Sequence, residues 1–135
     1  MAINIAVVED EKAASDVIKG YIERYGQENS LQFKVTQYPD AVSLLDQYSS
    51  LHDIIFMDIQ MPDLNGMELS RMLPEGTRLI FTTAFKEYAF ESYEVNAVDF
   101  LLKPIRYNKF IAAVEKVERL MSLEAKAQVA EPAHK

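Results

Sequence analysis

Five short apolar segments alternate along the chain with segments in which apolar residues recur every three or four positions. The short runs are typical of strands buried on both faces, and the longer spacing is typical of amphipathic helices. Strict alternation of the two predicts an open parallel sheet with helices on both of its faces. The predicted strands span 3–8, 31–36, 54–58, 79–83 and 98–102, and the predicted helices span 14–25, 40–48, 67–73, 86–93 and 110–121.

The number of strands narrows the topology. Right-handed crossovers leave few orders for five parallel strands, and the order 2-1-3-4-5 of the flavodoxin-like fold suits a chain of 135 residues best. We therefore expect an α/β fold, a flavodoxin-like doubly wound (βα)5 parallel sheet, over residues 1–124. Residues 125–135 lose the helical periodicity, and we expect a C-terminal tail or the start of an interdomain linker there.

Two local signals indicate helix ends. Gly26 follows the apolar face of the first helix, and because glycine is common just after the last turn of a helix, we expect that helix to stop there. Asp40 precedes the second helix and is a candidate N-cap, since its carboxylate can accept a hydrogen bond from a backbone N–H of the first turn.

Composition excludes several classes of protein. The chain has no cysteine, which excludes a disulfide framework, a thiolate metal site and a cysteine nucleophile, and which fits a cytoplasmic protein. No apolar run approaches the roughly 20 residues of a membrane span, so we expect no membrane partner. The formal net charge of −7 argues against nucleic-acid binding by this segment, because phosphate contacts need a basic face. DNA is expected to be a partner only through an effector domain absent from this chain.

Polar side chains follow four of the predicted strands. Glu9 and Asp10 come after the first strand, Asp58 ends the third, Thr83 ends the fourth and Lys103 follows the fifth. Because function collects at the carboxyl ends of the strands in such sheets, we expect these side chains to rim one pocket.

This set of residue types suits phosphoryl transfer to a carboxylate. Close carboxylates repel one another, and a divalent cation relieves the repulsion. Ligands that are all oxygen select a hard ion, Mg²⁺ or Mn²⁺. Mg²⁺ takes only one or two carboxylates, which leaves a coordination position for a phosphoryl oxygen. An aspartate can attack phosphorus, while a lysine ammonium and a threonine hydroxyl stabilise the transferring group.

The chain resembles the receiver domain of two-component response regulators. The resemblance runs from residue 3 to about residue 124, and a second set of residues, 81–85 with 95–104, is similar to the receivers attached to LytTR-type (LytR/AlgR-like) DNA-binding domains. Four short motifs in the same order carry it: Glu9-Asp10, the stretch from Phe56 to Gly66 around Asp58, Thr83-Ala84 and Lys103-Pro104.

The resemblance implies a role for each residue of the pocket. Asp58 would be the phosphoacceptor, and Lys103 would contact Asp58 or its phosphoryl group. Asp10 would hold Mg²⁺ directly and Glu9 through water, with the backbone carbonyl of Gln60 as a further ligand. Glu9 stands where many receivers have aspartate, a mild departure from the family pattern. The Lys103–Pro104 peptide bond is commonly cis in this family.

The resemblance also implies a switch and partners. Thr83 and Phe100 occupy the switch positions, and a cognate histidine kinase would be the phosphoryl donor. Phosphorylation is expected to favour a homodimer through the face made by the fourth helix, the fifth strand and the fifth helix. The candidate exposed residues of that face are Lys86, Glu87, Glu91, Glu94, Lys109, Glu115 and Glu118, beside Phe85 and Phe90.

Other interpretations stay open from the residues alone. An acidic pair after a strand is often only a favourable helix N-terminus, and Thr82 fits a plain β-branched strand residue. A phosphatase that forms an aspartyl phosphate is disfavoured, because Gln60 stands where a second acid would protonate the leaving group. A flavin-binding module is disfavoured because Glu9 and Asp10 would repel a ligand phosphate. A stand-alone receiver that acts on a protein partner is the alternative to a LytTR transcription regulator.

Overall fold

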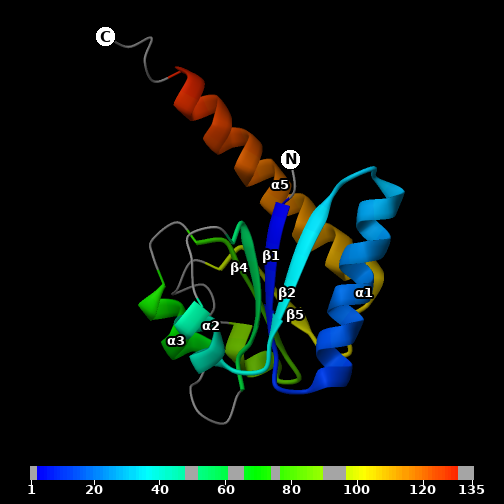
Figure 1. Cartoon of the computed structure of the whole chain (residues 1–135), viewed down its shortest axis with the longest axis vertical. Coiled ribbons are helices and arrows are strands. Elements are labelled where there is room, and N and C mark those ends of the chain that lie inside the picture. Colours follow the sequence, from blue (N-terminus) through cyan, green and yellow to red (C-terminus); the bar gives the residue numbers. More distant parts are fainter. Residues whose placement is uncertain (1–2, 48–51, 61–65, 74–76, 90–96, 131–135) are drawn as a thin grey trace.

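The computed structural model describes residues 3–47, 52–60, 66–73, 77–89 and 97–130. Strands and helices alternate along the chain as the sequence predicts (Figure 1). The elements are β1 (Ile3–Val8), α1 (Lys12–Glu28), β2 (Phe33–Tyr38), α2 (Ala41–Gln47), β3 (Ile54–Asp58), α3 (Gly66–Met72), β4 (Leu79–Thr83), the 3₁₀ turn η1 (Lys86–Tyr88), β5 (Asp99–Leu102) and α5 (Tyr107–Ala130).

The five strands form one parallel sheet in the order β2-β1-β3-β4-β5. This order confirms the predicted flavodoxin-like (βα)5 fold. Three of the strands, β1, β3 and β4, have strands on both sides, and β3 and β4 are buried along their whole length. Burial on both faces explains why these segments read as continuous apolar runs in the sequence.

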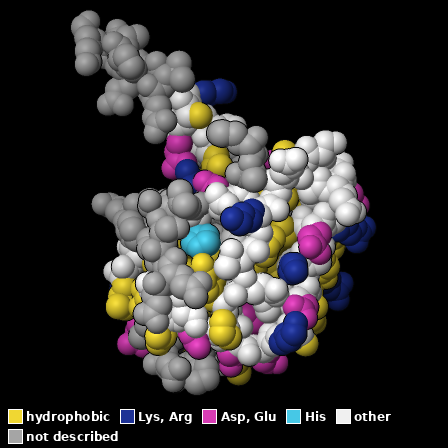
Figure 2. Space-filling view, viewed as in Figure 1, with side chains coloured by type: hydrophobic (Ala, Val, Ile, Leu, Met, Phe, Trp, Pro, Cys, Tyr) yellow, Lys and Arg dark blue, Asp and Glu magenta, His cyan; other side chains and the backbone are white. Residues whose placement is uncertain are grey.

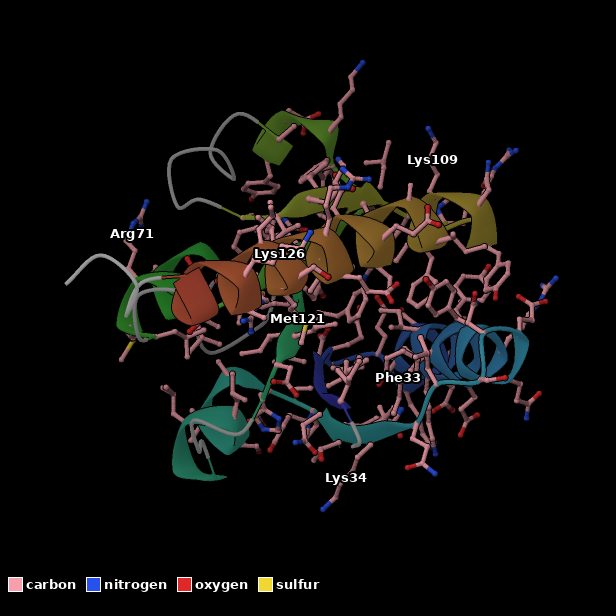
Figure 3. All side chains as sticks on the ribbon, turned by 90° about the horizontal axis from the view of Figure 1, so that it is seen from above. Phe33, Lys34, Arg71, Lys109, Met121 and Lys126 are labelled. Atoms are coloured by element: carbon pink, nitrogen blue, oxygen red, sulfur yellow. The ribbon has the colours of Figure 1, made fainter. Side chains whose placement is uncertain are left out.

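Helices cover both faces of the sheet and enclose a core on each. Figure 3 shows α1 and α5 on one side and α2 and α3 on the other. Phe33 of β2 points toward α1 and stacks obliquely on Tyr25, whereas its neighbour Lys34 points away from it (Figure 3). We call the core under α1 and α5 the first cluster and the core under α2 and α3 the second cluster.

Phe110 of α5 is the centre of the first cluster. Its ring stacks on Phe56 of β3 at a centroid distance of 5.5 Å and contacts Tyr21 and Tyr25 of α1. Tyr107, one turn earlier on α5, stacks on it as well. One aromatic side chain thus ties α5 to the sheet and to α1.

The end of α1 differs from the prediction. The helix runs past Gly26 to Glu28 and leaves through Ser30, which has a left-handed φ of 56°. The N–H of Leu31 bonds to the carbonyl of Gly26 in this turn, so β2 begins at Phe33, two residues later than predicted. Gly26 is needed for space instead, because a Cβ there would lie 3.0 Å from the Leu31 carbonyl oxygen.

Three other expectations can be compared with the structure. Asp40 is the N-cap of α2, because its Oδ1 accepts the Ser43 N–H at 2.7 Å. The predicted helix over 86–93 begins with η1, and residues 90–93 lie outside the described residues, as does the end of the predicted helix at 48. Glu118, expected on an exposed face, is half-buried and accepts a hydrogen bond from the Tyr25 hydroxyl of α1.

The last helix is longer than the sequence pattern predicts. It continues six residues past residue 124, through Ala130, and its end projects beyond the body of the domain (Figure 1). Residues 125–130 were expected in a tail or linker because apolar periodicity is lost there. Alanine, lysine and glutamine are strong helix formers, so the backbone stays helical without an apolar face.

Candidate functional site

Four polar residues form a row along the carboxyl edge of the sheet. The strand register places Glu9 beside Asp58, and Asp58 opposite Thr82. Lys103 follows β5, the neighbour of β4, and its N–H extends the ladder to the Thr83 carbonyl. We call Glu9, Asp58, Thr82 and Lys103 the polar row. It lies on the α1 and α5 side of the sheet, because the residues two positions earlier all belong to the first cluster: Val7, Phe56, Ile80 and Leu101.

The Lys103 ammonium joins the two carboxylates of the polar row. Its Nζ lies 2.6 Å from Glu9 Oε1 and 3.6 Å from Asp58 Oδ2. Glu9 and Asp58 are buried, at 3% and 5% exposure, so the cation compensates charges that water does not reach freely. The other Glu9 oxygen accepts the Glu11 N–H at 3.2 Å. The sequence implied a contact from Lys103 to Asp58, whereas its shorter contact is to Glu9.

Three carboxylates gather where the first and third strands end. Oxygens of Glu9, Asp10 and Asp58 lie within 4.8 Å of one another, and Asp10 is exposed to solvent. An all-oxygen group with one exposed carboxylate fits a hard divalent cation such as Mg²⁺, which prefers oxygen ligands and keeps part of its water.

Burial and repulsion shape the ionisation of this site. Burial, with the adjacent Glu9, raises the pKa of Asp58 to about 7 from its ordinary 3.8, although the Lys103 charge opposes this. Burial alone would lower the pKa of Lys103, but its hydrogen bond to Glu9 and the charge of Asp58 outweigh burial and raise that pKa. An ionised Asp58 is therefore costly in the absence of a further cation.

The raised pKa of Asp58 leads to a stability prediction. The folded state binds the Asp58 proton more tightly than the unfolded chain, so ionisation of Asp58 lowers the free energy of unfolding. This loss is complete above about pH 7 and absent below about pH 4. With a chelator at about pH 8, Asp58→Asn is expected to raise the free energy of unfolding by about 1–2 kcal/mol, after allowance for solvent screening. Urea unfolding at about pH 8 and pH 5 checks this, because the gain must shrink at the lower pH. Asp16→Asn is a control of opposite sign. Hydrogen bonds from Gln37 and Lys12 lower the pKa of Asp16, so this substitution should lower the free energy of unfolding, and by a similar amount at both pH values.

Gln60 lies next to Asp58 through its backbone. The Gln60 N–H donates to Asp58 Oδ1 at 3.3 Å, and its side-chain amide donates to the Tyr88 hydroxyl at 3.2 Å. The loop after β3 is thereby linked to η1. The peptide bond between Lys103 and Pro104 is cis.

Thr83 and Phe100 lie on the other side of the sheet from the polar row. Thr83 is buried, and its Oγ1 accepts the Phe85 N–H at 3.2 Å. Phe100 is half-buried and packs against the second cluster, paired with Phe81 of β4. Thr82 has the more unusual environment. The sequence pattern suggested only a β-branched strand residue, but the side chain is buried within the polar row.

Comparison with known families decides what this arrangement belongs to. Residues 5–115 match the response regulator receiver domain family. The chain belongs to this receiver family. The strand order is the one that the sequence predicts, and Glu9, Asp10 and Asp58 lie together where β1 and β3 end.

Curated relatives place the receiver near the LytTR-type regulators. It is 32% identical over 120 residues to the sensory transduction protein LytT of Bacillus cereus, covering 87% of this chain and 48% of that protein. It is 29% identical over 134 residues to the positive alginate biosynthesis regulatory protein of Pseudomonas aeruginosa, covering 97% and 53%. The chain thus spans about half the length of the curated relatives it matches.

Solved receiver structures share the fold. The response regulatory domain of MrkE from Klebsiella pneumoniae is 27% identical, with a TM-score of 0.77 over 90% of this chain and 99% of that one. The response regulator DrrB of Thermotoga maritima is 26% identical, with a TM-score of 0.74 over 88% and 54%. Among the described residues, none of the helices is both long and apolar enough to cross a membrane.

Proposed function

We propose that this receiver accepts a phosphoryl group on Asp58 from the phosphohistidine of a cognate histidine kinase. The observation that carries the proposal is the pairing of two buried carboxylates, Glu9 and Asp58, with the Lys103 ammonium beside a third, exposed carboxylate. This is a site that gains stability from one more cation and holds a nucleophile next to a fixed positive charge.

The chain's own residues supply most of the chemistry. An Asp58 carboxylate oxygen attacks phosphorus, the P–N bond to the donor imidazole breaks, and its electron pair stays on the imidazole nitrogen. Lys103, within 3.6 Å of Asp58, stabilises charge on the transferred group. Mg²⁺, when bound, neutralises charge on the transferring oxygens. The residues proposed to hold it are Glu9, Asp10, Asp58 and the backbone carbonyl of Gln60; Mn²⁺ would fit the same oxygens.

The test is the intact mass of the protein after incubation with acetyl phosphate and Mg²⁺. The wild-type receiver is expected to gain one phosphoryl group, whereas Asp58→Asn is expected to gain none, because it lacks the nucleophilic oxygen. Asp16→Asn, a control on the exposed face of α1, is expected to behave as wild type. A phosphoryl group on Asp58→Asn, or none on wild type, would contradict the proposal.

The proposed chemistry is that of a signalling phosphoacceptor and not of a turnover enzyme. Gln60, two residues past Asp58, is a neutral amide engaged with Tyr88, so it offers no proton to a leaving group. Self-phosphorylation and self-dephosphorylation would be its only reactions. Sustained hydrolysis of small phosphate esters would instead favour the phosphatase alternative.

Thr83 and Phe100 are proposed to carry the signal away from Asp58. They lie on adjacent strands at the same face of the sheet, with the Thr83 hydroxyl turned toward the Phe85 N–H. Movement of that hydroxyl to a phosphoryl oxygen breaks this bond and opens space that Phe100 can fill. The charge added at Asp58 would thus shift the equilibrium between two arrangements of these side chains near η1 and β5.

Phosphorylation is further proposed to favour a homodimer through the helix-four, β5 and α5 face. In its described part, this face exposes Leu102 of the edge strand and Phe85, at 46% and 44% exposure, and α5 exposes the charged Lys109 and Glu115. Phe90, Glu91 and Glu94, also expected there, lie outside the described residues. Apolar side chains among charges of both signs suit a symmetric contact.

Sedimentation tests the dimer. Beryllofluoride with Mg²⁺ is expected to convert a monomer to a dimer, and Leu102→Glu is expected to weaken the dimer by about tenfold or more, because it places a carboxylate at its centre. Val42→Glu, at an equally exposed site on α2, is the control and should leave the dimer unchanged. Equal masses with and without beryllofluoride would contradict the proposal.

The wider setting follows the relatives of the receiver. We propose that it controls an attached LytTR DNA-binding domain, so that DNA is a partner only through that domain; a stand-alone receiver is the alternative.

The kinase would approach over an open apolar groove of about 560 Å³ beside Lys103, lined in part by Val17 and Pro104. A cysteine-free chain suits the reducing cytoplasm, and we propose that location.

A further inference from the structure

One buried hydroxyl at the site has no hydrogen-bond partner among the residues that the structure describes. Thr82 is 1% exposed, and its Oγ1 makes no hydrogen bond within the described part of the chain. A buried hydroxyl without a partner costs free energy, and valine would fill nearly the same volume without that cost. The presence of threonine therefore calls for a state of the site in which the hydroxyl is used.

Thr82 lies inside the polar row, between the groups that carry its charges. It is directly opposite Asp58 on β3, and Lys103 follows the strand on its other side. The Lys103 side chain begins beyond β5 and ends with its ammonium beside Glu9 and Asp58. It therefore crosses the end of β4, the strand whose buried hydroxyl is unpartnered.

The present partners of the Lys103 ammonium are also candidates to hold a cation. Glu9 Oε1, at 2.6 Å, is its closest acceptor, and Glu9 belongs to the acidic group around Asp58. When the Glu9 carboxylate turns toward a cation, Lys103 loses that acceptor. An ammonium has three N–H donors, and the Thr82 hydroxyl oxygen is an acceptor on the strand that lies between Lys103 and Asp58.

We propose that Thr82 is a positioning residue whose hydroxyl accepts a hydrogen bond from the Lys103 ammonium once Glu9 turns to a bound cation, and so holds that ammonium against Asp58. The inference rests on the proposed function for what Lys103 does at Asp58. It gives a physical reason why this position has a hydroxyl that destabilises the metal-free fold.

Two substitutions of Thr82 distinguish the proposed hydrogen bond to Lys103 from a purely structural role of the side chain. Thr82→Val keeps the shape and removes the hydroxyl, so it is expected to melt at a higher temperature than wild type in chelator. With saturating Mg²⁺, it is expected to be phosphorylated by acetyl phosphate about tenfold more slowly, the loss of one charge-assisted hydrogen bond. Thr82→Ser keeps the hydroxyl but loses a buried methyl, so it should melt lower yet react within about twofold of wild type. Thr36→Val, on β2 away from the site, is the control for both measurements.

Several results would overturn the proposal. These are a wild-type phosphorylation rate in Thr82→Val, an equal slowing in Thr82→Ser, or a lower melting temperature for Thr82→Val, which would mean that the hydroxyl is already bonded in the metal-free fold. A readout independent of phosphorylation is the ¹⁵N signal of the Lys103 ammonium, assigned by its loss in Lys103→Arg. In Mg²⁺ it should exchange its protons slowly in wild type and Thr82→Ser and fast in Thr82→Val. If wild type gains no phosphoryl group, the proposed function fails, and this signal still decides the use of Thr82.

Discussion

Lys103→Met is expected to lower the free energy of unfolding by about 3 kcal/mol at about pH 8 in chelator. The substitution keeps the apolar stem and removes the ammonium, which leaves the buried carboxylates of Glu9 and Asp58 facing each other without a cation. The pKa of Asp58, already raised by burial and by Glu9, must rise further. The folded state then binds protons more tightly, so the loss of stability must diminish as the pH falls toward about 5.

Urea unfolding at the two pH values measures this effect, and a second ion pair supplies the control. Lys116 pairs with Asp99 at 3.2 Å, but its side chain is 48% exposed, so Lys116→Met should cost about 1 kcal/mol or less. Added Mg²⁺ should stabilise Lys103→Met more than wild type, since it replaces the missing charge. Equal losses for the two substitutions would mean that Glu9 and Asp58 do not depend on Lys103.

Phe110→Ala is expected to lower the free energy of unfolding by about 4 kcal/mol. The ring is fully buried and contacts Phe56 of the sheet and both tyrosines of α1, so its removal leaves a cavity where three elements meet. Urea unfolding measures the loss. Leu123→Ala, on the same helix but 56% exposed, should change stability by less than about 0.5 kcal/mol. A small loss for Phe110→Ala would mean that α5 is held chiefly by its other contacts.

The topology could be predicted from the sequence because it depends on patterns that span the whole chain. Five apolar runs alternate with amphipathic segments, and this alternation leaves few arrangements for a parallel sheet. The cap at Asp40 was predictable for a similar reason, since a single local hydrogen bond decides it. The end of α1 was not, because Ser30 adopts a left-handed φ that serine does not signal.

The meeting of the acids and Lys103 at one edge could also be predicted, since parallel strands end together. Which carboxylate lies closer to the Lys103 ammonium could not be predicted, because that depends on how far the side chain reaches from β5 past β4 and β3. The burial of Thr82 within the polar row depends on which face of β4 it occupies, and two successive threonines look alike to any sequence pattern. The roles proposed for Thr83, Phe100 and the Gln60 carbonyl stay predictions.

The length of α5 makes it a lever. The helix has 24 residues, so it is about 36 Å long. Contacts hold it as far as Glu124, which pairs with Arg78, and its last six residues project beyond the body of the domain (Figures 1 and 2). A tilt of the helix by about 10° would displace the end of this projecting segment, about 9 Å past Glu124, by about 1.6 Å relative to Glu124. A rotation of α5 on the sheet would thereby become a displacement of its projecting end, without any change inside the helix.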